Sequence, residues 1–144
     1  MKKLILFTVL AAIFASCEGP RGFNGLDGKD GLFSQRIVEL SVTAADWQPM
    51  PSSSNVRYYS AYFNNVSEIT ENIFYDGIVL CYLYENNRQI ILPSVRHNES
   101  VGNLWTNTID FEYFIGGLEI FFTNSDLYYP APPQDMIFVL QILY

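Results

Sequence analysis

Apolar and polar side chains alternate, or apolar ones gather into short runs, along most of the chain after Gly31. Gly, Pro, Asn, Asp and Ser interrupt these stretches at intervals typical of β-strands and their turns. Residues 35–43 illustrate the alternation, because Val38, Leu40 and Val42 fall on one face of an extended chain. Helical periodicity is scarce, so the pattern predicts an all-β domain.

The strands follow from where these runs begin and end. Residues 85–87 and the pair Gly116-Gly117 are turn-prone, and each joins two neighbouring runs into a hairpin. The last run is nearly all apolar, which is typical of a central strand covered on both faces. The pattern predicts about seven strands, at residues 35–43, 56–63, 78–84, 88–92, 106–115, 118–123 and 136–144.

Residues 67–73 are interpreted as a connector that holds at most one helical turn, which Ser67 or Thr70 would cap. Seven short strands with regular turns favour a single antiparallel β-sandwich, because a sheet with one apolar face must bury it against another sheet. A small β-barrel is the alternative. The sequence disfavours a parallel α/β fold, since nothing in it supplies the crossover helices.

The N-terminus carries an export pattern. Lys2 and Lys3 precede an apolar run at 4–14, which is far shorter than the ~20 residues that span a bilayer as a helix. Small residues then lead directly into Cys17, and residues 14–17 resemble a bacterial lipobox. We therefore expect 1–16 to be a cleaved signal peptide and Cys17 to carry lipid. The alternative is an ordinary secretory signal beside a chance cysteine.

Glycine then occupies every third position from Gly19 to Gly31. This period is the one that a collagen triple helix requires, because only glycine fits at its crowded axis. The four triplets contain a single proline, so we expect an extended spacer over 17–33, unless the globular domains themselves form a homotrimer. At ~3.1 Å per residue, such a spacer would hold the domain, residues 34–144, roughly 40 Å from the membrane.

The net charge of the mature chain limits the classes of partner that it can bind. Without Lys2 and Lys3 the mature chain has six basic and fifteen acidic residues, a net charge of about −9. Such an acidic chain is a poor match for nucleic acid, whose phosphates need a basic surface. The remaining partners are the membrane, through the lipid, and a protein or a glycan. The hydrophobic fraction of 49% is sufficient for one core.

Residues suited to catalysis are few. The single histidine, His97, lies in a polar stretch that we interpret as a loop, and Cys81 lies in an apolar strand as a small buried side chain. Asp110 and Glu112 share one face of a strand, which is typical of a solvated sheet face, and Asp126 is expected to cap a turn. We therefore predict no enzyme activity, no metal site and no cofactor.

Aromatic side chains are the remaining route to a function. The sequence is rich in them around the predicted strands, and exposed rings stack on sugars and on protein partners. The alternative is that most of them fill the core. The rings considered are Trp47, Tyr58, Tyr59, Tyr62, Trp105, Tyr128 and Tyr129, of which Trp105, Tyr128 and Tyr129 lie beside polar, turn-prone residues and are the candidate ligand contacts.

Taken together, these features resemble the small collagen-like lipoproteins of Bacteroides-type Gram-negative bacteria, in which a lipobox, a short Gly-X-Y tract and a compact β domain follow one another. The resemblance implies a cell-envelope location, with lipid anchoring at the outer membrane, and implies no catalytic residue. It rests on Cys17, residues 19–31, Asp46-Trp47, 69–70 with 77–83, 91–93, 117–120, Asn124-Ser125-Asp126 and the apolar C-terminal strand.

Two functional classes agree with the sequence. The first is a non-enzymatic envelope lipoprotein with a structural, assembly or protein-interaction role. The second is a surface module that binds glycans or mediates adhesion through exposed aromatic side chains. Trp105 is the residue whose substitution would separate the two classes.

Overall fold

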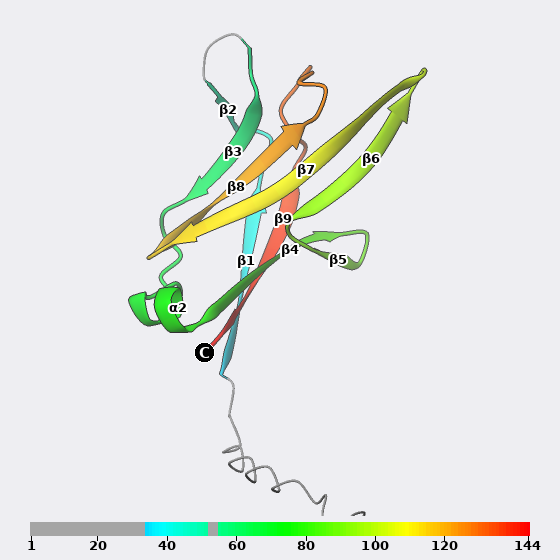
Figure 1. Cartoon of the computed structure of the whole chain (residues 1–144). Helices are drawn as coiled ribbons and strands as arrows, with labels where there is room; N and C mark the ends of the chain where they lie inside the picture. The colour runs from blue at the N-terminus through cyan, green and yellow to red at the C-terminus, as the bar shows by residue number, and fades with distance from the viewer. Residues whose placement is uncertain (1–33, 52–54) are drawn as a thin grey trace, which may run out of the picture. The chain divides into compact units, whose positions relative to one another are not determined.

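Nine strands and one short helix make up residues 34–51 and 55–144, the part of the chain that the computed structural model describes (Figure 1). The predicted signal peptide 1–16, the lipidation site Cys17 and the spacer 17–33 lie outside the described residues. The elements are β1 (Gln35–Val42), β2 (Gln48–Met50), β3 (Tyr58–Phe63), α2 (Glu71–Asp76), β4 (Ile78–Glu85), β5 (Arg88–Ile91), β6 (Ser94–Ser100), β7 (Asn103–Phe114), β8 (Gly117–Asn124) and β9 (Met136–Leu143).

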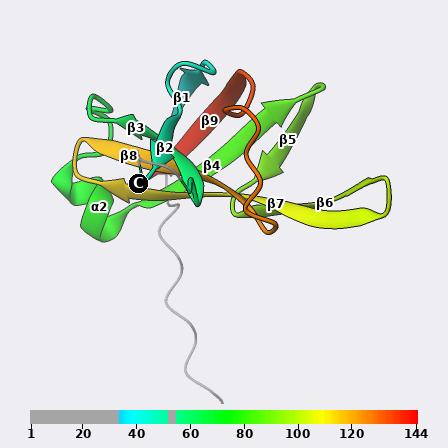
Figure 2. The ribbon, with the colours of Figure 1, turned by 90° about the horizontal axis from the view of Figure 1, so that it is seen from above.

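The strands form two antiparallel sheets that pack face to face, as Figure 2 shows from above. We call them sheet A, with the order β1-β9-β4-β5, and sheet B, with the order β2-β3-β8-β7-β6. The chain passes from sheet A to sheet B between β5 and β6, through Leu92 and Pro93. The sheets do not close on one another, so the predicted β-sandwich is confirmed and the barrel is not observed.

All seven predicted strands are present with ends shifted by a few residues, but two further strands were missed. The strand β2 is only three residues long and contains Pro49. The strand β6 is almost entirely polar and forms because it pairs along its whole length with β7. The interpretation of His97 as a loop residue is therefore wrong, since His97 lies exposed in β6 opposite Thr106.

The predicted connector at 67–73 contains the start of the helix α2. Thr70 is its N-cap, and its Oγ1 accepts a hydrogen bond from the backbone N–H of Ile73 at 3.4 Å. This leaves Ser67 outside the helix. The side chain of Ile73 is buried, which fixes the short helix against the rest of the domain.

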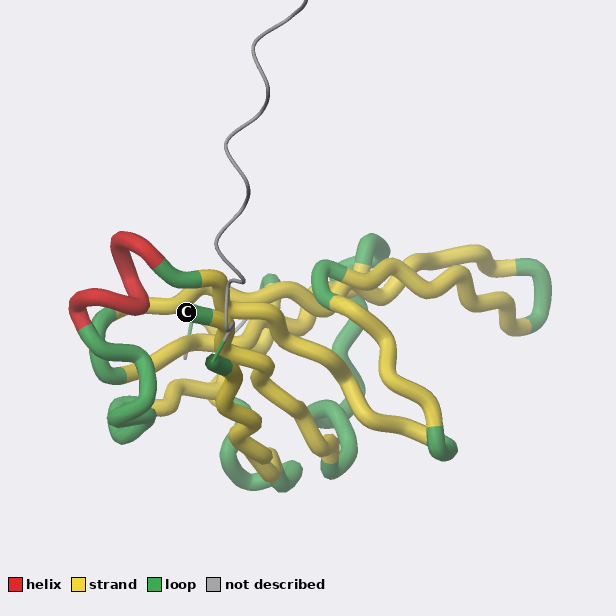
Figure 3. The backbone as a smooth tube through the Cα atoms, turned by 90° about the horizontal axis from the view of Figure 1, so that it is seen from below, coloured by secondary structure: helices red, strands yellow, loops and turns green. Residues whose placement is uncertain are grey.

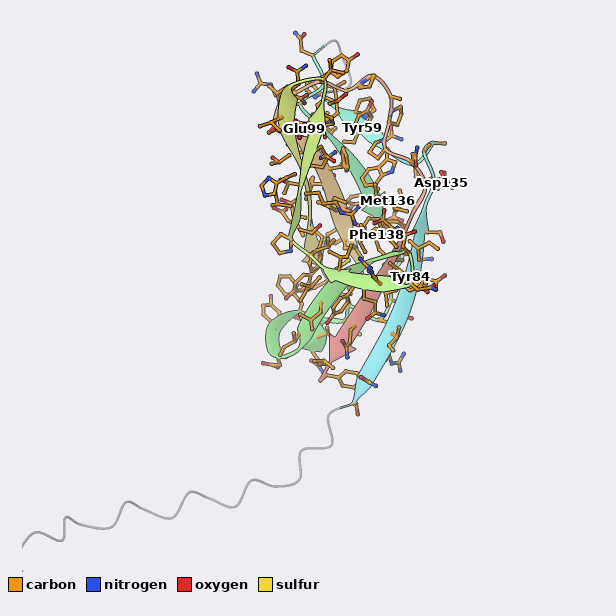
Figure 4. All side chains as sticks on the ribbon, turned by 90° about the vertical axis from the view of Figure 1, so that its right-hand side faces the viewer. Tyr59, Tyr84, Glu99, Asp135, Met136 and Phe138 are labelled. Atoms are coloured by element: carbon orange, nitrogen blue, oxygen red, sulfur yellow. The ribbon has the colours of Figure 1, made fainter. Side chains whose placement is uncertain are left out.

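The core lies between the two sheets. Phe138, Leu140 and Ile142 of β9 are completely buried and face the inner side of sheet B, to which β8 contributes Leu118 and Ile120 (Phe138 is labelled in Figure 4). Each fully buried side chain of this size contributes roughly 1.5–3 kcal/mol relative to exposure. Cys81 is also buried, as the sequence predicted.

The strand β9 is central in sheet A, between β1 and β4, as predicted. The prediction that both of its faces are covered is wrong. Its inner residues are buried, whereas Ile137 on the outer face is 37% exposed, and its neighbours across the ladder include Tyr84, which is 41% exposed. Sheet A therefore has an apolar outer face within the described residues.

Candidate binding groove

A groove of about 590 Å³ lies where sheet B extends beyond sheet A. The hairpin of β6 and β7 projects past the rest of the domain, as Figure 3 shows, and its tip forms one wall. Trp105 and Asn107 of β7 and Phe122 of β8 line the groove beside this tip, and the loop 126–134 that follows β8 forms the opposite wall. The hairpin tip and the loop 126–134, which form its walls, lie at the end of the sandwich away from the start of β1 (Figure 1).

Trp105 and Tyr128, two of the three predicted ligand contacts, both line this groove. Trp105 lies on the same face of β7 as Asn107 and the buried Ile109, because side chains alternate along a strand. Its ring is half-buried, whereas Tyr128 is 67% exposed. The structure therefore brings together one partly sheltered ring and one freely accessible ring.

Tyr129 has a different environment. Its hydroxyl accepts a hydrogen bond from the backbone N–H of Asn124 at 2.8 Å and donates one to the carbonyl of Arg57 at 2.5 Å. Its ring packs edge-to-face on Tyr59, with 5.5 Å between ring centroids, and burial raises the pKa of Tyr129. Tyr129 thus fastens the loop 126–134 to the core, while its neighbour Tyr128 faces the groove.

Three asparagine side chains are linked by hydrogen bonds, and two of them, Asn107 and Asn124, line the groove. The amide of Asn98 on β6 donates to Asn107 on β7, and that of Asn107 donates to Oδ1 of Asn124 on β8 at 2.8 Å. The amide of Asn124 then donates to the carbonyl of Tyr128 at 2.8 Å. Because the amides of Asn107 and Asn124 both donate and accept, this asparagine chain fixes three strands and the ring-bearing loop relative to one another.

Sequence reasoning missed these asparagines. Asn107 occupies the inner face of a strand that becomes apolar two residues later, at Ile109, and Asn98 shares the inner face of β6 with Ser94 and Arg96. A polar amide at an inward position of a strand is the signal that would have found them. Inward polar groups are expected only where a core ends or a site begins.

The polar surface continues between the two sheets. A smaller cavity of about 150 Å³ is lined by Arg96, Asn98 and Asn107 together with the buried Ser94, whose Oγ has no hydrogen-bond partner among the described residues. Arg96 of sheet B forms an ion pair with Glu85 of sheet A at 2.5 Å, and this hydrogen bond lowers the pKa of Glu85. Both side chains are substantially exposed, so this ion pair links the two sheets but contributes little to the free energy of unfolding.

Backbone strain borders the groove on both sides. Val101, at the tip of the hairpin, has φ +48° and is fully exposed, and Leu127, in the loop, has φ +55°. Branched or bulky side chains disfavour this left-handed region, at a cost of order 1–3 kcal/mol each. Such strain is found preferentially at functional sites, which agrees with a site between these two segments.

Asp110, Glu112 and Cys81 lie outside the groove, whereas Asp126 lines it. Asp110 and Glu112 occupy the outer face of β7, away from Trp105, and burial followed by the charge of Glu112 raises the pKa of Asp110. Burial raises the pKa of the Cys81 thiol to about 12, which leaves it protonated. Among residues 34–51 and 55–144, no cluster of three His, Cys, Asp or Glu side chains is arranged to hold a metal ion.

Asp126 caps a turn as predicted, because its Oδ1 accepts a hydrogen bond from the backbone N–H of Tyr128 at 3.1 Å. A second depression, of about 550 Å³, lies at the other end of the domain beside α2, and Arg36, Glu68 and Tyr144 contribute to its lining. It contains only one ring, so it is a weaker candidate. None of the described helices has the length and apolar character of a membrane-spanning helix.

Comparison of the chain with protein-family models, with curated proteins and with solved structures found no match. The groove geometry is therefore the basis for the functional assignment.

Proposed function

We infer that this protein is a non-enzymatic, lipid-anchored module of the cell envelope that binds carbohydrate in the groove between the β6–β7 hairpin and the loop 126–134. The observation that carries the proposal is the convergence of two rings, the half-buried Trp105 and the exposed Tyr128, on a row of amide side chains. Sugars present apolar C–H faces that stack on rings, and hydroxyls that pair with amides and carboxylates.

The polar groups of the groove suit this ligand class. Asn103, Asp126 and Gln134 line the groove, and together with the asparagine chain they offer both donors and acceptors. Lys and Arg are missing from the groove lining, which disfavours phosphate or another polyanion as the ligand. A neutral or weakly basic oligosaccharide is the chemistry that fits.

The position of the groove also supports an envelope role. Backbone hydrogen bonds between Ser34 and Tyr144, at 2.9 and 3.0 Å, hold the start of the described chain against its end. The groove lies at the opposite end of the sandwich (Figure 1). If Cys17 carries lipid, a spacer that leaves the domain at Ser34 would direct the groove away from the membrane.

The test is a glycan array, followed by calorimetric titration of the sugars that bind. We expect binding by the wild type and its loss in Trp105→Ala. Tyr75→Ala is the control, since Tyr75 lies on α2, outside the groove, and is 68% exposed, as much as the groove residue Tyr128. Binding that survives Trp105→Ala, or that disappears equally in Tyr75→Ala, would refute the groove as the site.

A second candidate function is assembly of envelope proteins, and the apolar outer face of sheet A favours it. Protein partners recovered from an envelope extract, in the absence of any sugar binding, would support this alternative over the glycan-binding proposal.

A further inference from the structure

The two outer faces of the sandwich differ in chemistry. The outer face of sheet B carries Asp110, Glu112 and Glu119 on its central strands and His97 and Glu99 on β6 (Glu99 is labelled in Figure 4). Charged side chains of this kind are expected on a sheet face that meets water. The same face also exposes Tyr62, Val95 and Leu104, so the two outer faces differ mainly in their number of charged residues.

The outer face of sheet A is apolar on its two central strands, β9 and β4, and each edge strand adds one isoleucine, Ile37 on β1 and Ile91 on β5. The ladder pairings place nine apolar or aromatic side chains there, and the single charged residue is Glu39, on the edge strand β1. Several of these side chains are strongly exposed, including Ile37 at 66% and Ile78 and Ile91 at 54% each. The nine are Ile37, Ile78, Leu80, Tyr82, Tyr84, Ile91, Ile137, Val139 and Leu143.

This face has the anatomy of a protein interface. Its centre, on β9 and β4, is almost wholly apolar, while Gln35, Glu39 and Ser41 on β1 and Gln89 on β5 form a polar rim. Exposed apolar residues rimmed by polar ones are typical of protein interaction sites.

The one polar side chain at the centre is already satisfied. Gln141 accepts a hydrogen bond from the hydroxyl of Tyr82 at 3.3 Å and donates one to Gln35 at 3.2 Å. Covering the face would therefore leave neither its amide oxygen nor its amide nitrogen without a partner, which removes the usual penalty for burying a glutamine.

The sequence next to this face indicates which molecule covers it. The Gly-X-Y tract ends at Gly31, and only three residues separate it from β1, which is an edge strand of sheet A. A tract of this period forms its helix only with two further copies of itself. Four triplets are too few to associate alone, but holding three domains together raises the effective concentration of their tracts.

We propose that the outer face of sheet A is the contact surface of a homotrimer, in which three copies pack these faces around a three-fold axis. The cyclic arrangement places the three starts of β1 at one end, where their Gly-X-Y tracts meet. A two-fold pair of the same faces, with its strands antiparallel, would place the tracts at opposite ends. The trimer also gathers three groove-bearing ends of the sandwich at its other end, where a repetitive ligand would be bound with avidity.

The test is native mass spectrometry and sedimentation equilibrium of the full-length lipidated protein in detergent. We expect three times the mass of one chain, and a monomer for Ile137→Lys. The matched control is Val95→Lys, which introduces the same charge at a 56% exposed apolar residue on the outer face of sheet B and should remain trimeric. Ile37→Lys is a second variant with little risk to folding, because Ile37 is 66% exposed, and circular dichroism verifies the fold of each.

A monomeric or dimeric wild type would overturn the proposal, and so would trimers that persist in both folded lysine variants of sheet A. Gly25→Ala separates the face from the tract: the trimer should persist, because the face holds it, whereas a monomer would show that the tract alone drives association. Trp105→Ala should leave the number of copies in the assembly at three. The sugar-binding proposal and the trimer proposal can therefore fail separately.

Discussion

Asn107 donates a side-chain hydrogen bond to Asn124 at 2.8 Å, directly across the ladder between β7 and β8. Two residues farther along β7, the equivalent cross-strand pair is Ile109 and Phe122, and both side chains belong to the apolar interior. The amide pair therefore marks the point at which the sandwich core ends and the groove begins. It also links the β6–β7 hairpin to the loop that carries Tyr128.

Asn107→Ala should weaken both the groove and the fold around it. The substitution leaves Asn98 and Asn124 without their shared partner, and we expect a loss of about 1–2 kcal/mol in the free energy of unfolding. Urea denaturation measures this loss, and amide exchange should show faster opening at Tyr128. Asn103→Ala is the control, because Asn103 lines the same groove with no side-chain hydrogen bond within the described residues. Equal losses in the two variants would contradict the role of the asparagine chain.

Tyr129→Phe should destabilise the protein by about 1–3 kcal/mol. The change keeps the ring against Tyr59 and removes only the hydroxyl, so the N–H of Asn124 and the carbonyl of Arg57 each lose a partner. The control Tyr128→Phe removes the hydroxyl of an exposed ring and should be nearly neutral. Thermal melts of the two variants make the comparison, and a neutral Tyr129→Phe would show that the hydroxyl does not brace the loop.

How much of the fold could be predicted depended on whether the inner face of each strand is apolar in its own sequence. The strands β1 and β9 were predicted nearly to the residue, because their inner faces are regularly apolar. The turn between β4 and β5 was also predicted, since Asn86 and Asn87 both adopt positive φ, which asparagine tolerates in a two-residue hairpin. The strand β6 was missed, because pairing with β7 determines its structure more than its own sequence does.

Of the candidate site, the two rings were predicted and the asparagines were not. Trp105 and Tyr128 were identified from their polar surroundings, and the fold brings them into one groove. Asn107 was not, because an asparagine on a strand is ordinarily taken as solvent-facing, and Asn98 was not, because its segment was interpreted as a loop. The exposure of the outer face of sheet A could not be predicted from the sequence either. An apolar strand has the same sequence pattern whether a second layer of the domain or a second copy of the protein covers it.

Val101→Asn should stabilise the domain by about 1 kcal/mol, because asparagine adopts positive φ with less strain than a β-branched residue does. Val101 is fully exposed and forms the hairpin turn with Gly102, so no packing is lost. Equilibrium denaturation measures the gain. The matched control Val95→Asn replaces an exposed valine within β6 and should be neutral or slightly destabilising. A destabilised Val101→Asn would mean that the valine side chain itself supports the hairpin.

Cys17→Ala should abolish membrane attachment and leave the β domain folded, because the proposed anchor is the acyl chains on this residue and each buried methylene contributes about 0.8 kcal/mol to membrane binding. Fractionation of cells, together with labelling by palmitate, measures attachment. Cys81→Ala is the control and should keep its label, since Cys81 is buried in the core. Palmitate incorporated into the Cys17→Ala protein would refute the anchor.

Asp110→Asn should raise the stability at neutral pH, with a gain that disappears in acid. Burial, followed by the charge of Glu112, raises the pKa of Asp110 in the folded state, so the folded protein binds this proton more tightly than the unfolded chain does. Ionised Asp110 therefore opposes folding at neutral pH, and the wild type regains this stability as the pH falls through the raised pKa. The difference in stability between variant and wild type should fade below the pKa of the unfolded chain, about 3.9.

Thermal melts across this pH range measure the difference. The control is Thr108→Asn, an uncharged change on the same face of β7, whose stability should differ from that of the wild type by the same amount at every pH. A variant less stable than the wild type at neutral pH, or a gain that persists in acid, would show that ionised Asp110 does not destabilise the folded state.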